Sequence, residues 1–205
     1  MSYERSKRLL DASVAAASLV VLGPVLIALA VAVRMTSPGP ALHRSVRCGR
    51  NGDPFVLLKF RSMRVDAAMA GPGVTQANDP RITTVGRWIR RSKLDELPQL
   101  INVLKGEMSV VGPRPEDPRY IAMYTPAQRA ILRFRPGITS PASVTFRDEE
   151  RILAAADDLE SAYKAVMAKK IDIDLNYFPS ATLGDDLKLI AKTARAVLRT
   201  SPRWT

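Results

Sequence analysis

The sequence predicts an α+β protein that is mostly helical, with a membrane helix at its N-terminus and a compact cytosolic domain behind it. An uncharged run of 22 residues, 12–33, is long enough to cross a bilayer as a helix. Short apolar stretches further on are typical of strands, and later segments have the spacing of surface amphipathic helices. The structure-breaking sequence at 37–40 divides the chain into a membrane helix, 1–36, and a cytosolic domain, 37–205.

The flanks of the uncharged run indicate how it meets the membrane. Cations precede it (Arg5, Lys7, Arg8) and follow it (Arg34, Arg44, Arg47, Arg50). Because cations favour the cytoplasmic side, both ends are expected there. Pro24, preceded by Gly23, interrupts the run near its middle and eases a turn. We therefore expect a re-entrant hairpin, and a simple single span is the open alternative. A cleaved secretory signal is disfavoured because the apolar run continues to Val33, past the candidate cleavage site.

The composition indicates a polyanionic partner. The chain has 205 residues and a net charge of +11, which favours nucleic acid, anionic lipid or a phosphorylated substrate. Its single cysteine, Cys48, excludes an internal disulfide framework and fits a reducing compartment. Its single histidine, His43, cannot make a His-rich metal site, so general-base chemistry would fall to carboxylates or lysines.

The first half of the cytosolic domain contains one clear strand. Residues 55–63 alternate in their second half, which places Lys59, Arg61 and Met63 on one face. Two cations on one face suit an anion, and a solvated sheet edge is the alternative. Residues 66–79 have little pattern, and we expect a mobile loop of the kind that often serves as a lid.

Asp95 and Glu96 are the residues around which the chemistry is expected to be organised. They stand just ahead of a helical run, 97–104, that Gly106 ends. Arginines flank them on both sides: Arg87, Arg90, Arg91 and Arg114. Carboxylates in such a place can hold Mg²⁺ or attack phosphorus, and guanidinium groups can clamp phosphate oxygens. On the residues alone, the alternative is that the pair only caps the helix, because acids are favoured in first turns.

The remaining elements are short, and proline turns separate them. Residues 108–111 are expected to form a strand, and the turns that follow it and Phe134 hold Arg114 and Arg135 in stiff backbone. Helices are expected around 88–89 and at 126–134, 149–170 and 184–198. The last two are amphipathic, and either core packing or a membrane surface would suit them.

Seven stretches, in order along the chain, resemble the motifs of the bacterial sugar transferase family, in particular its small monotopic polyprenyl-phosphate phosphoglycosyl transferases. They are Lys7–Asp11, Ser37–Pro40, Lys59–Met63, Asn78–Thr83, Leu94–Leu100, Gly112–Glu116 and Arg135–Thr139. Each stretch alone is a weak signal, but the ordered set covers nearly the whole chain. The resemblance therefore favours a catalytic role for the acid pair over a cap.

The resemblance implies a reaction and a set of roles. Such enzymes transfer a sugar-1-phosphate from a UDP-sugar to undecaprenyl phosphate, release UMP and use Mg²⁺. Matched by motif, Asp95 is the expected nucleophile, forming a covalent phosphoglycosyl-aspartate, and a ligand of the metal; Glu96 is its catalytic partner. The expected phosphate-binding residues are Lys59, Arg61, Arg90, Arg114 and Arg135.

The resemblance also implies a cellular setting. The reaction would be the first membrane step of a glycoconjugate pathway, at the bacterial inner membrane, with the catalytic domain on the cytoplasmic face. Anionic membrane lipid is an expected partner, and the sequence leaves a homodimer open. Residues 140–143 depart from the family pattern in a segment expected to face the nucleotide sugar, so the sugar is not assigned. Gly23, where the family usually has serine, and Ser45, where many relatives have glutamine, are further departures.

Two other classes of function are alternatives to an enzyme. A basic, membrane-anchored binding protein would use the charge of +11 without catalysis, but the aromatic and basic platform of single-strand binders is missing, and no recognition-helix or zinc signature is present. We therefore expect no nucleic-acid partner. A scaffold whose acid pair is only a cap is the remaining alternative, and replacing Asp95 would then cost about 1 kcal/mol of stability and nothing else.

Overall fold

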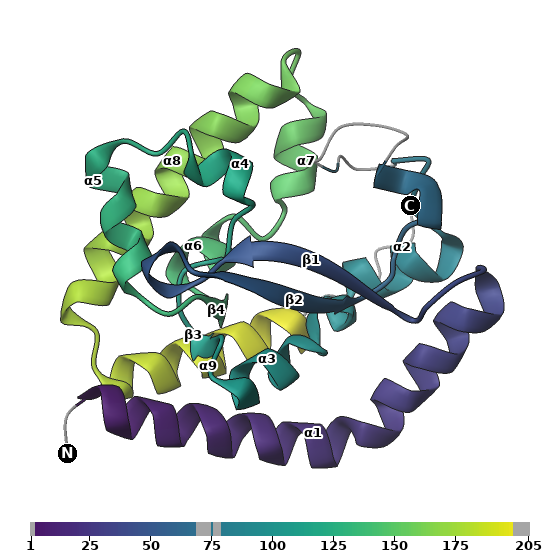
Figure 1. Ribbon diagram of the computed structural model, residues 1–205, viewed down its shortest axis with the longest axis horizontal. Coiled ribbons are helices and arrows are strands. Elements are labelled where there is room, and N and C mark those ends of the chain that lie inside the picture. The colour runs from purple at the N-terminus through teal and green to yellow at the C-terminus, as the bar shows by residue number, and fades with distance from the viewer. Residues whose placement is uncertain (1–2, 69–74, 76–78, 199–205) are drawn as a thin grey trace.

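The computed structural model describes residues 3–68, 75 and 79–198, and it is mostly helical with a few short strands (Figure 1). The helices are α1 (Tyr3–Thr36), α2 (Thr84–Arg91), α3 (Gln99–Lys105), α4 (Pro118–Ile121), α5 (Pro126–Arg129), α6 (Pro141–Thr145), α7 (Glu149–Ala154), α8 (Leu159–Tyr177) and α9 (Leu183–Leu198). The strands are β1 (Leu42–Cys48), β2 (Pro54–Phe60), β3 (Ser109–Val111) and β4 (Gly137–Thr139). The expected loop at 66–79 falls mostly outside the described residues.

Helix α1 is one continuous helix with Pro24 inside it. It is the single helix of the described chain that is long and apolar enough to cross a membrane. The structure differs from the expected hairpin, because α1 bends along its length and does not fold back on itself (Figure 1). Proline removes one hydrogen bond from a helix and kinks it, which accounts for a bend in α1 without a full reversal. How α1 meets a bilayer stays a prediction.

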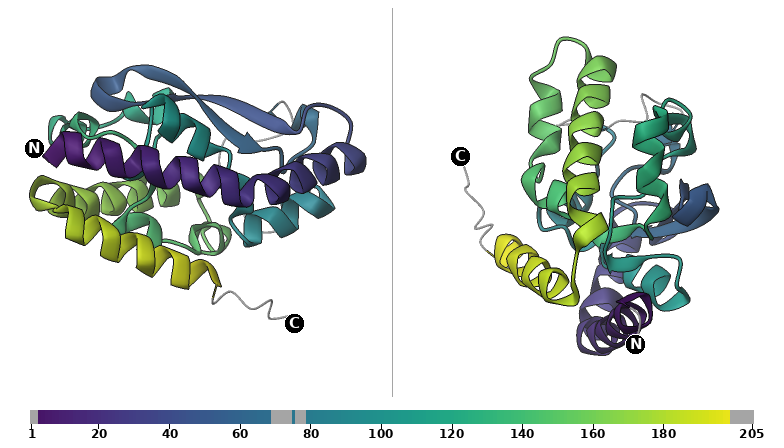
Figure 2. Two further views of the ribbon diagram at one scale, coloured as in Figure 1. Left: turned by 90° about the horizontal axis from the view of Figure 1, so that it is seen from below. Right: turned by 90° about the vertical axis from the view of Figure 1, so that its left-hand side faces the viewer.

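Both ends of α1 are bound to the same folded body. Near its N-terminus, Lys7 donates to Asp186 of α9 at 2.7 Å. Just beyond its C-terminus, the buried Arg61 guanidinium donates to the carbonyls of Pro38 at 2.6 Å and Ser37 at 2.7 Å. Figure 2 shows α1 and α9 side by side, and the two helices are in contact. The N-terminal helix is therefore part of the body rather than a free tail.

A long antiparallel hairpin crosses the middle of the molecule in Figure 1. Strand β1 pairs with β2, with His43 opposite Lys59. Strand β1 was not expected from the sequence, because two arginines and a histidine hide the alternation. Strand β2 confirms the strand expected at 55–63 but ends at Phe60. Because the strand ends there, Arg61 does not share the face of Lys59 and turns toward the end of α1 instead.

Strands β3 and β4 form a short parallel pair, with Ser109 opposite Gly137. Around them lies the main core, formed by buried side chains of the central elements: Leu57, Leu100, Val103, Met108, Val111, Ile131, Met167 and Phe178 are among them. A buried carboxylate joins α1 to this pair, because Asp11 accepts from the amide of Val110 at 3.0 Å. The two strands thus anchor α1 and the turns that carry Arg114 and Arg135.

The C-terminal half contains one correction. The single helix expected at 149–170 is two helices, α7 and α8, separated by four residues that include a cap. The Asp158 carboxylate accepts from the amides of Glu160 and Ser161 and so begins α8 afresh. The helices expected around 88–89, at 97–104 and at 184–198 are confirmed to within a turn. The one expected at 126–134 is the short helix α5 followed by a 3₁₀ turn, Ala130–Arg133. Because of the break between α7 and α8, α7 does not continue the direction of α8, and its residues line the pocket described below.

Candidate active site

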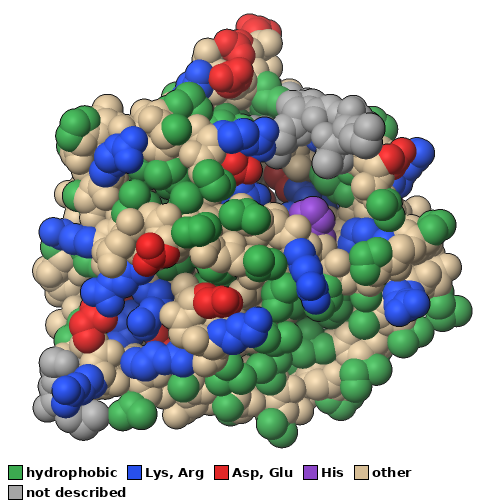
Figure 3. Space-filling model, viewed as in Figure 1, with side chains coloured by type: hydrophobic (Ala, Val, Ile, Leu, Met, Phe, Trp, Pro, Cys, Tyr) green, Lys and Arg blue, Asp and Glu red, His purple; other side chains and the backbone are tan. Residues whose placement is uncertain are grey.

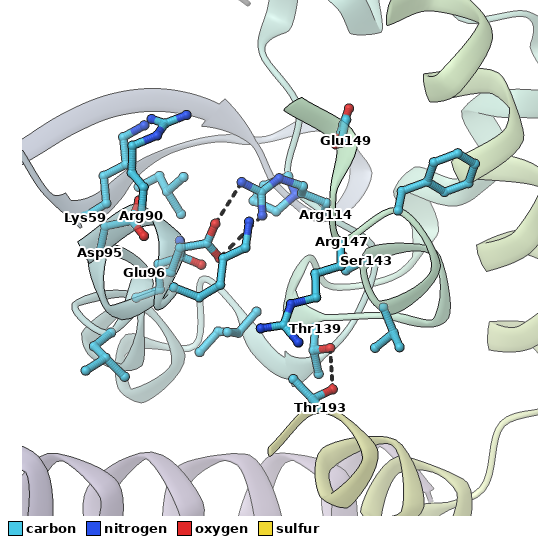
Figure 4. Close-up of a pocket in the computed structure, with 18 of the residues that line it drawn as sticks. Lys59, Arg90, Asp95, Glu96, Arg114, Thr139, Ser143, Arg147, Glu149 and Thr193 are labelled. Carbon is cyan, nitrogen blue, oxygen red and sulfur yellow. Dashed lines mark hydrogen bonds and ion pairs between the residues drawn. The ribbon is translucent and has the colours of Figure 1, made fainter. Parts of the chain in front are cut away.

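A pocket of about 530 Å³ lies between β2, the acid pair, the β3–β4 turns, α7 and α9. Figure 4 shows its labelled side chains converging from these elements. Its polar part contains Lys59, Arg90, Asp95, Glu96 and Arg114. The structure therefore brings five of the seven sequence-predicted site residues into one cavity.

Local backbone geometry positions the acid pair. Lys93 adopts a left-handed conformation, with φ of 58°, immediately before the short 3₁₀ turn Leu94–Glu96 that holds both carboxylates. Such a conformation costs a non-glycine residue on the order of 1 kcal/mol. Helix α3 begins later, at Gln99. Its N-cap residue is Pro98, and no side chain caps the helix there. Neither carboxylate is therefore positioned as the cap of α3.

Asp95 is a buried carboxylate with 7% of its surface exposed. Its Oδ1 atom is buried without a hydrogen-bond partner among the residues that the structure describes. Burial, and next the charge of Glu96, raise the pKa of Asp95 to about 6. Arg90, Lys59 and Lys93 act in the opposite direction. The carboxylate is thus ionised at neutral pH but poorly solvated, which suits a nucleophile.

Glu96 has the opposite environment from its neighbour. Its carboxylate accepts from the Arg114 guanidinium at 2.9 Å. Burial would raise the pKa of Glu96, but the charge and hydrogen bond of Arg114 lower it to about 2. Glu96 in turn raises the pKa of Arg114. The two adjacent carboxyl groups therefore differ in pKa because one is paired with a cation and the other is not.

Two further cations face the acid pair. Burial, and next the charge of Arg90, lower the pKa of Lys59 to about 8. Arg90 donates to Glu150 of α7, and at 3.4 Å to the hydroxyl of Ser62. Figure 4 places Lys59 and Arg90 beside Asp95. This cluster is where a phosphate would be attracted most strongly.

The structure places the other two predicted phosphate ligands elsewhere. Arg61 is 5% exposed, and its guanidinium is engaged by backbone carbonyls that follow α1. Arg135 lies in a separate groove with Glu4, Arg5, Arg8 and Leu9. Within the described residues, neither Arg61 nor Arg135 lines the pocket of the acid pair. Arg61 fixes the exit of α1 instead.

The pocket also contains residues that the sequence reading did not single out. Lys170 of α8 donates to Glu149 of α7 at 2.9 Å, and the hydroxyls of Thr139 and Thr193 lie 2.8 Å apart (Figure 4). Glu150 lines the pocket as well. Two adjacent glutamates, Glu149 and Glu150, begin α7. Acidic residues are common in the first turn of any helix, so the sequence provides no clear sign that these two belong to the site. Residue Ser143, in the segment expected to face the nucleotide sugar, does line the pocket.

One wall of the pocket is apolar and includes part of the N-terminal helix α1. Val14 and Leu22 of α1 line it together with Leu100, Ile138 and Ile190. On the outside, hydrophobic side chains gather over the bent part of α1 along the lower right edge of Figure 3. Val25, Ile27, Val31 and Met35 are exposed there. The pocket therefore combines a charged region with an apolar wall, and the helix that contributes to this wall also exposes apolar side chains on the outside.

The pocket offers few ligands for a divalent cation. Within the part of the chain that the structure describes, no three His, Cys, Asp or Glu side chains converge on one point. Mg²⁺ is commonly held by one or two carboxylates together with substrate phosphates, so a full protein cage is not required. The unpartnered Oδ1 of Asp95 is the oxygen that fits this arrangement.

Comparisons with known proteins agree with the geometry. The model of the family described as bacterial sugar transferase matches residues 2–200. A UDP-glucose:undecaprenyl-phosphate glucose-1-phosphate transferase of Caulobacter vibrioides is 38% identical over 98% of this chain and 72% of its own length. The protein of that name from Xanthomonas campestris is 41% identical over 94% of this chain, which spans 39% of that relative.

The name of a third relative contains a different sugar, N-acetylgalactosamine. A UDP-N-acetylgalactosamine-undecaprenyl-phosphate N-acetylgalactosaminephosphotransferase of Aeromonas hydrophila is 34% identical over 96% of this chain and 44% of its own length. This chain therefore spans less than half of some of the curated relatives that it matches. The family model nevertheless covers nearly every residue, including the acid pair and the turns around it. The chain belongs to the bacterial sugar transferase family.

Proposed function

We propose that this chain transfers a sugar-1-phosphate from a UDP-sugar to undecaprenyl phosphate and releases UMP. The observation that carries the proposal is Asp95, a buried carboxylate whose Oδ1 has no hydrogen-bond partner among the described residues, in a pocket that contains several cations and an apolar wall. The names of the relatives support both substrates. They differ in the sugar, so the proposal covers the reaction class and leaves the sugar unassigned.

The first step uses Asp95 as the nucleophile. One oxygen of Asp95 forms a bond to the β-phosphorus of the donor, and the bond from that phosphorus to the bridging oxygen breaks. UMP leaves with the bridging oxygen and its electron pair, and a phosphoglycosyl-aspartate remains. The partial desolvation of Asp95 supports this role, because a poorly hydrated carboxylate is a better nucleophile than one paired with a cation.

The cations of the pocket neutralise the diphosphate. Lys59 and Arg90 lie beside Asp95, where the reacting phosphate would sit, and Arg114 lies on the other side of the pair (Figure 4). Glu96 acts as the partner of Asp95, because it orients the Arg114 guanidinium and stays ionised through that contact. Fixed cations aimed at the developing charge supply the stabilisation that this chemistry needs. When bound at the free Asp95 oxygen, Mg²⁺ would add charge neutralisation on the diphosphate.

The second step returns the enzyme to its starting state. A phosphate oxygen of the lipid attacks the same phosphorus, and Asp95 leaves as a free carboxylate. The product is a sugar joined to the lipid through a diphosphate. The apolar wall formed by α1 supports this step, because it offers the prenyl chain a path to the charged region.

We further propose that α1 lies in the inner membrane with both ends on the cytoplasmic face. The contacts of Lys7 and of Ser37 with one folded body support this topology, since a straight crossing would place the two contacts on opposite sides. The cations that flank the helix support it independently. This places the glycoconjugate reaction where UDP-sugars are available.

The test is UMP release from a panel of UDP-sugars, with undecaprenyl phosphate and Mg²⁺ supplied. The wild-type chain should release UMP from at least one donor, and Asp95→Asn should abolish the release because an amide oxygen is a poor nucleophile. Asp172→Asn is the matched control, since Asp172 is exposed on α8 and outside the pocket. An active Asp95→Asn variant would remove Asp95 from the mechanism. Affinity for nucleic acid without turnover of any donor would favour a binding protein instead.

A further inference from the structure

Arg90 is a cation that is largely removed from water in the pocket. Its side chain is 15% exposed. One terminal nitrogen donates to Glu150 and the other, at 3.4 Å, to Ser62, while Nε is buried without a partner among the described residues. A buried guanidinium without a nearby anion is costly, so Glu150 supplies a counter-charge. The unpartnered Nε indicates that the present arrangement does not satisfy Arg90 completely.

Glu150 can leave Arg90 without unfolding its helix. Two other contacts hold α7 in place: Glu149 accepts from Lys170 at 2.9 Å, and Leu153 is buried with 2% of its surface exposed. The Glu150 side chain itself is 40% exposed. A rotation of one side chain into water is therefore enough to release the guanidinium, and α7 can stay where it is.

We infer that Glu150 is a resident anion that competes with the donor's diphosphate for Arg90 and thereby sets the affinity of the pocket for the donor. The inference rests on the proposed function, because it takes the diphosphate of a UDP-sugar as the competing ligand. Three cations that line the pocket are paired with carboxylates: Arg114 with Glu96, Lys170 with Glu149 and Arg90 with Glu150. Of these three carboxylates, Glu150 is the most exposed.

The effect of Glu150 on the affinity for the donor has an expected direction and size. A diphosphate carries more charge than one carboxylate and can engage a guanidinium at two points, so the donor should win. A partly exposed ion pair contributes little net free energy, so Glu150 tunes the affinity and does not close the site. Removing its charge should therefore tighten binding by about three- to fivefold.

The experiment measures equilibrium binding of UDP to the full-length chain in detergent. Glu150→Gln keeps the size of the side chain and removes its charge, and it should bind UDP about three- to fivefold more tightly than the wild type. Glu160→Gln is the matched control, because Glu160 pairs with Lys164 at an exposed position of α8 and makes the same change in net charge. The control should bind UDP as the wild type does.

A second pair of variants separates competition from a structural role. In an Arg90→Gln background, Glu150→Gln should give no further tightening, because the cation for which it competes is gone. Glu150→Ala should tighten binding as Glu150→Gln does, and thermal melting checks that each variant is folded. If Glu150 only held α7 in place, both substitutions would weaken UDP binding.

The outcomes are distinguishable from a failure of the proposed function. If the wild type releases UMP but Glu150→Gln binds UDP no more tightly, or if Glu160→Gln tightens it equally, the competition is refuted and the proposed function stands. If the wild type neither binds UDP nor releases UMP from any donor, the proposed function fails and the inference fails with it.

Discussion

At the scale of single residues, Asp95 is placed where its charge is unfavourable. It is buried, its Oδ1 has no partner in the described part of the chain, and its pKa is about 6 in the fold. A carboxyl group whose pKa is raised by folding contributes stability below its unfolded pKa, near 4, and loses that contribution as the pH rises through about 6. The ionised side chain therefore costs stability at neutral pH, as is common in active sites.

Asp95→Asn should consequently stabilise the protein while it abolishes UMP release. The expected gain in the free energy of unfolding at pH 8 is roughly 1–3 kcal/mol, and it should shrink toward pH 4, where Asp95 is protonated in the folded state. Denaturant melts at the two pH values measure it. A loss of about 1 kcal/mol at both pH values would instead match a helix cap.

The raised pKa of Asp95 and the lowered pKa of Lys59 predict how the reaction depends on pH. Asp95 must be ionised to attack, so kcat/KM should fall as the pH drops through about 6. Lys59 must be protonated to attract phosphate, so kcat/KM should also fall as the pH rises through about 8. A rate profile of UMP release should be bell-shaped, and Lys59→Arg should move the basic limb upward. A basic limb that stays in place would remove Lys59 from that role.

The roles of site residues could be predicted from the sequence where a family motif contributes side chains to the pocket. The motifs identified Asp95, Glu96 and the cations that line their pocket. They did not separate Arg114, which faces the pocket, from Arg61, which binds backbone carbonyls. Both belong to stretches that resemble family motifs, and only the point at which β2 ends decides which way Arg61 turns.

At the scale of elements, the β3–β4 pair depends on two glycines that face each other. A Cβ atom on Gly137 would lie 2.1 Å from the backbone nitrogen of Gly112, and one on Gly112 would lie 2.3 Å from the carbonyl oxygen of Arg135. Both contacts are with backbone, which cannot move aside. The close approach joins the turn that carries Arg114 to the turn that carries Arg135.

Gly137→Ala should therefore destabilise the protein by roughly 3 kcal/mol, at the upper end of overpacking effects. Gly184→Ala in α9 is the control, because its Cβ would meet nothing closer than the Thr182 hydroxyl at 3.6 Å. The control should be neutral or gain up to about 1 kcal/mol from helix propensity. Thermal melting compares the two. Equal melting temperatures would show that the strand pair tolerates a Cβ at this point.

The elements themselves were predictable where periodicity was strong. Helix α3 and strand β2 follow from their apolar spacing, and Gly106 ends α3 with a φ of 86° as expected. Strand β1 was missed because its pairing with β2, and not its own pattern, makes it a strand. The division between α7 and α8 was not expected. The capping residue Asp158 lies inside a continuous amphipathic pattern, and one such residue is a weak signal that a helix ends.

At the scale of the whole molecule, the account requires both ends of α1 on one side of the membrane. Single cysteines at Arg5→Cys and Pro40→Cys, which replace exposed residues at either end, can be labelled in a Cys48→Ala background. An impermeant maleimide should reach neither position in intact spheroplasts and both after permeabilisation. Labelling of one position from outside would show a single span and would detach one end of α1 from the body. The sequence predicted this topology from charge, and the contacts with Asp186 and Arg61 came only from the fold.

The most direct test of the account is to trap the enzyme during turnover. The wild-type chain is mixed with a radiolabelled or isotope-labelled UDP-sugar in the absence of undecaprenyl phosphate, quenched in acid and digested, and the peptide that contains Asp95 is examined by mass spectrometry. We predict a mass increase of one sugar-phosphate on Asp95, which disappears when the lipid phosphate is added. Product formation at full rate, without any adduct on that peptide, would contradict the covalent mechanism.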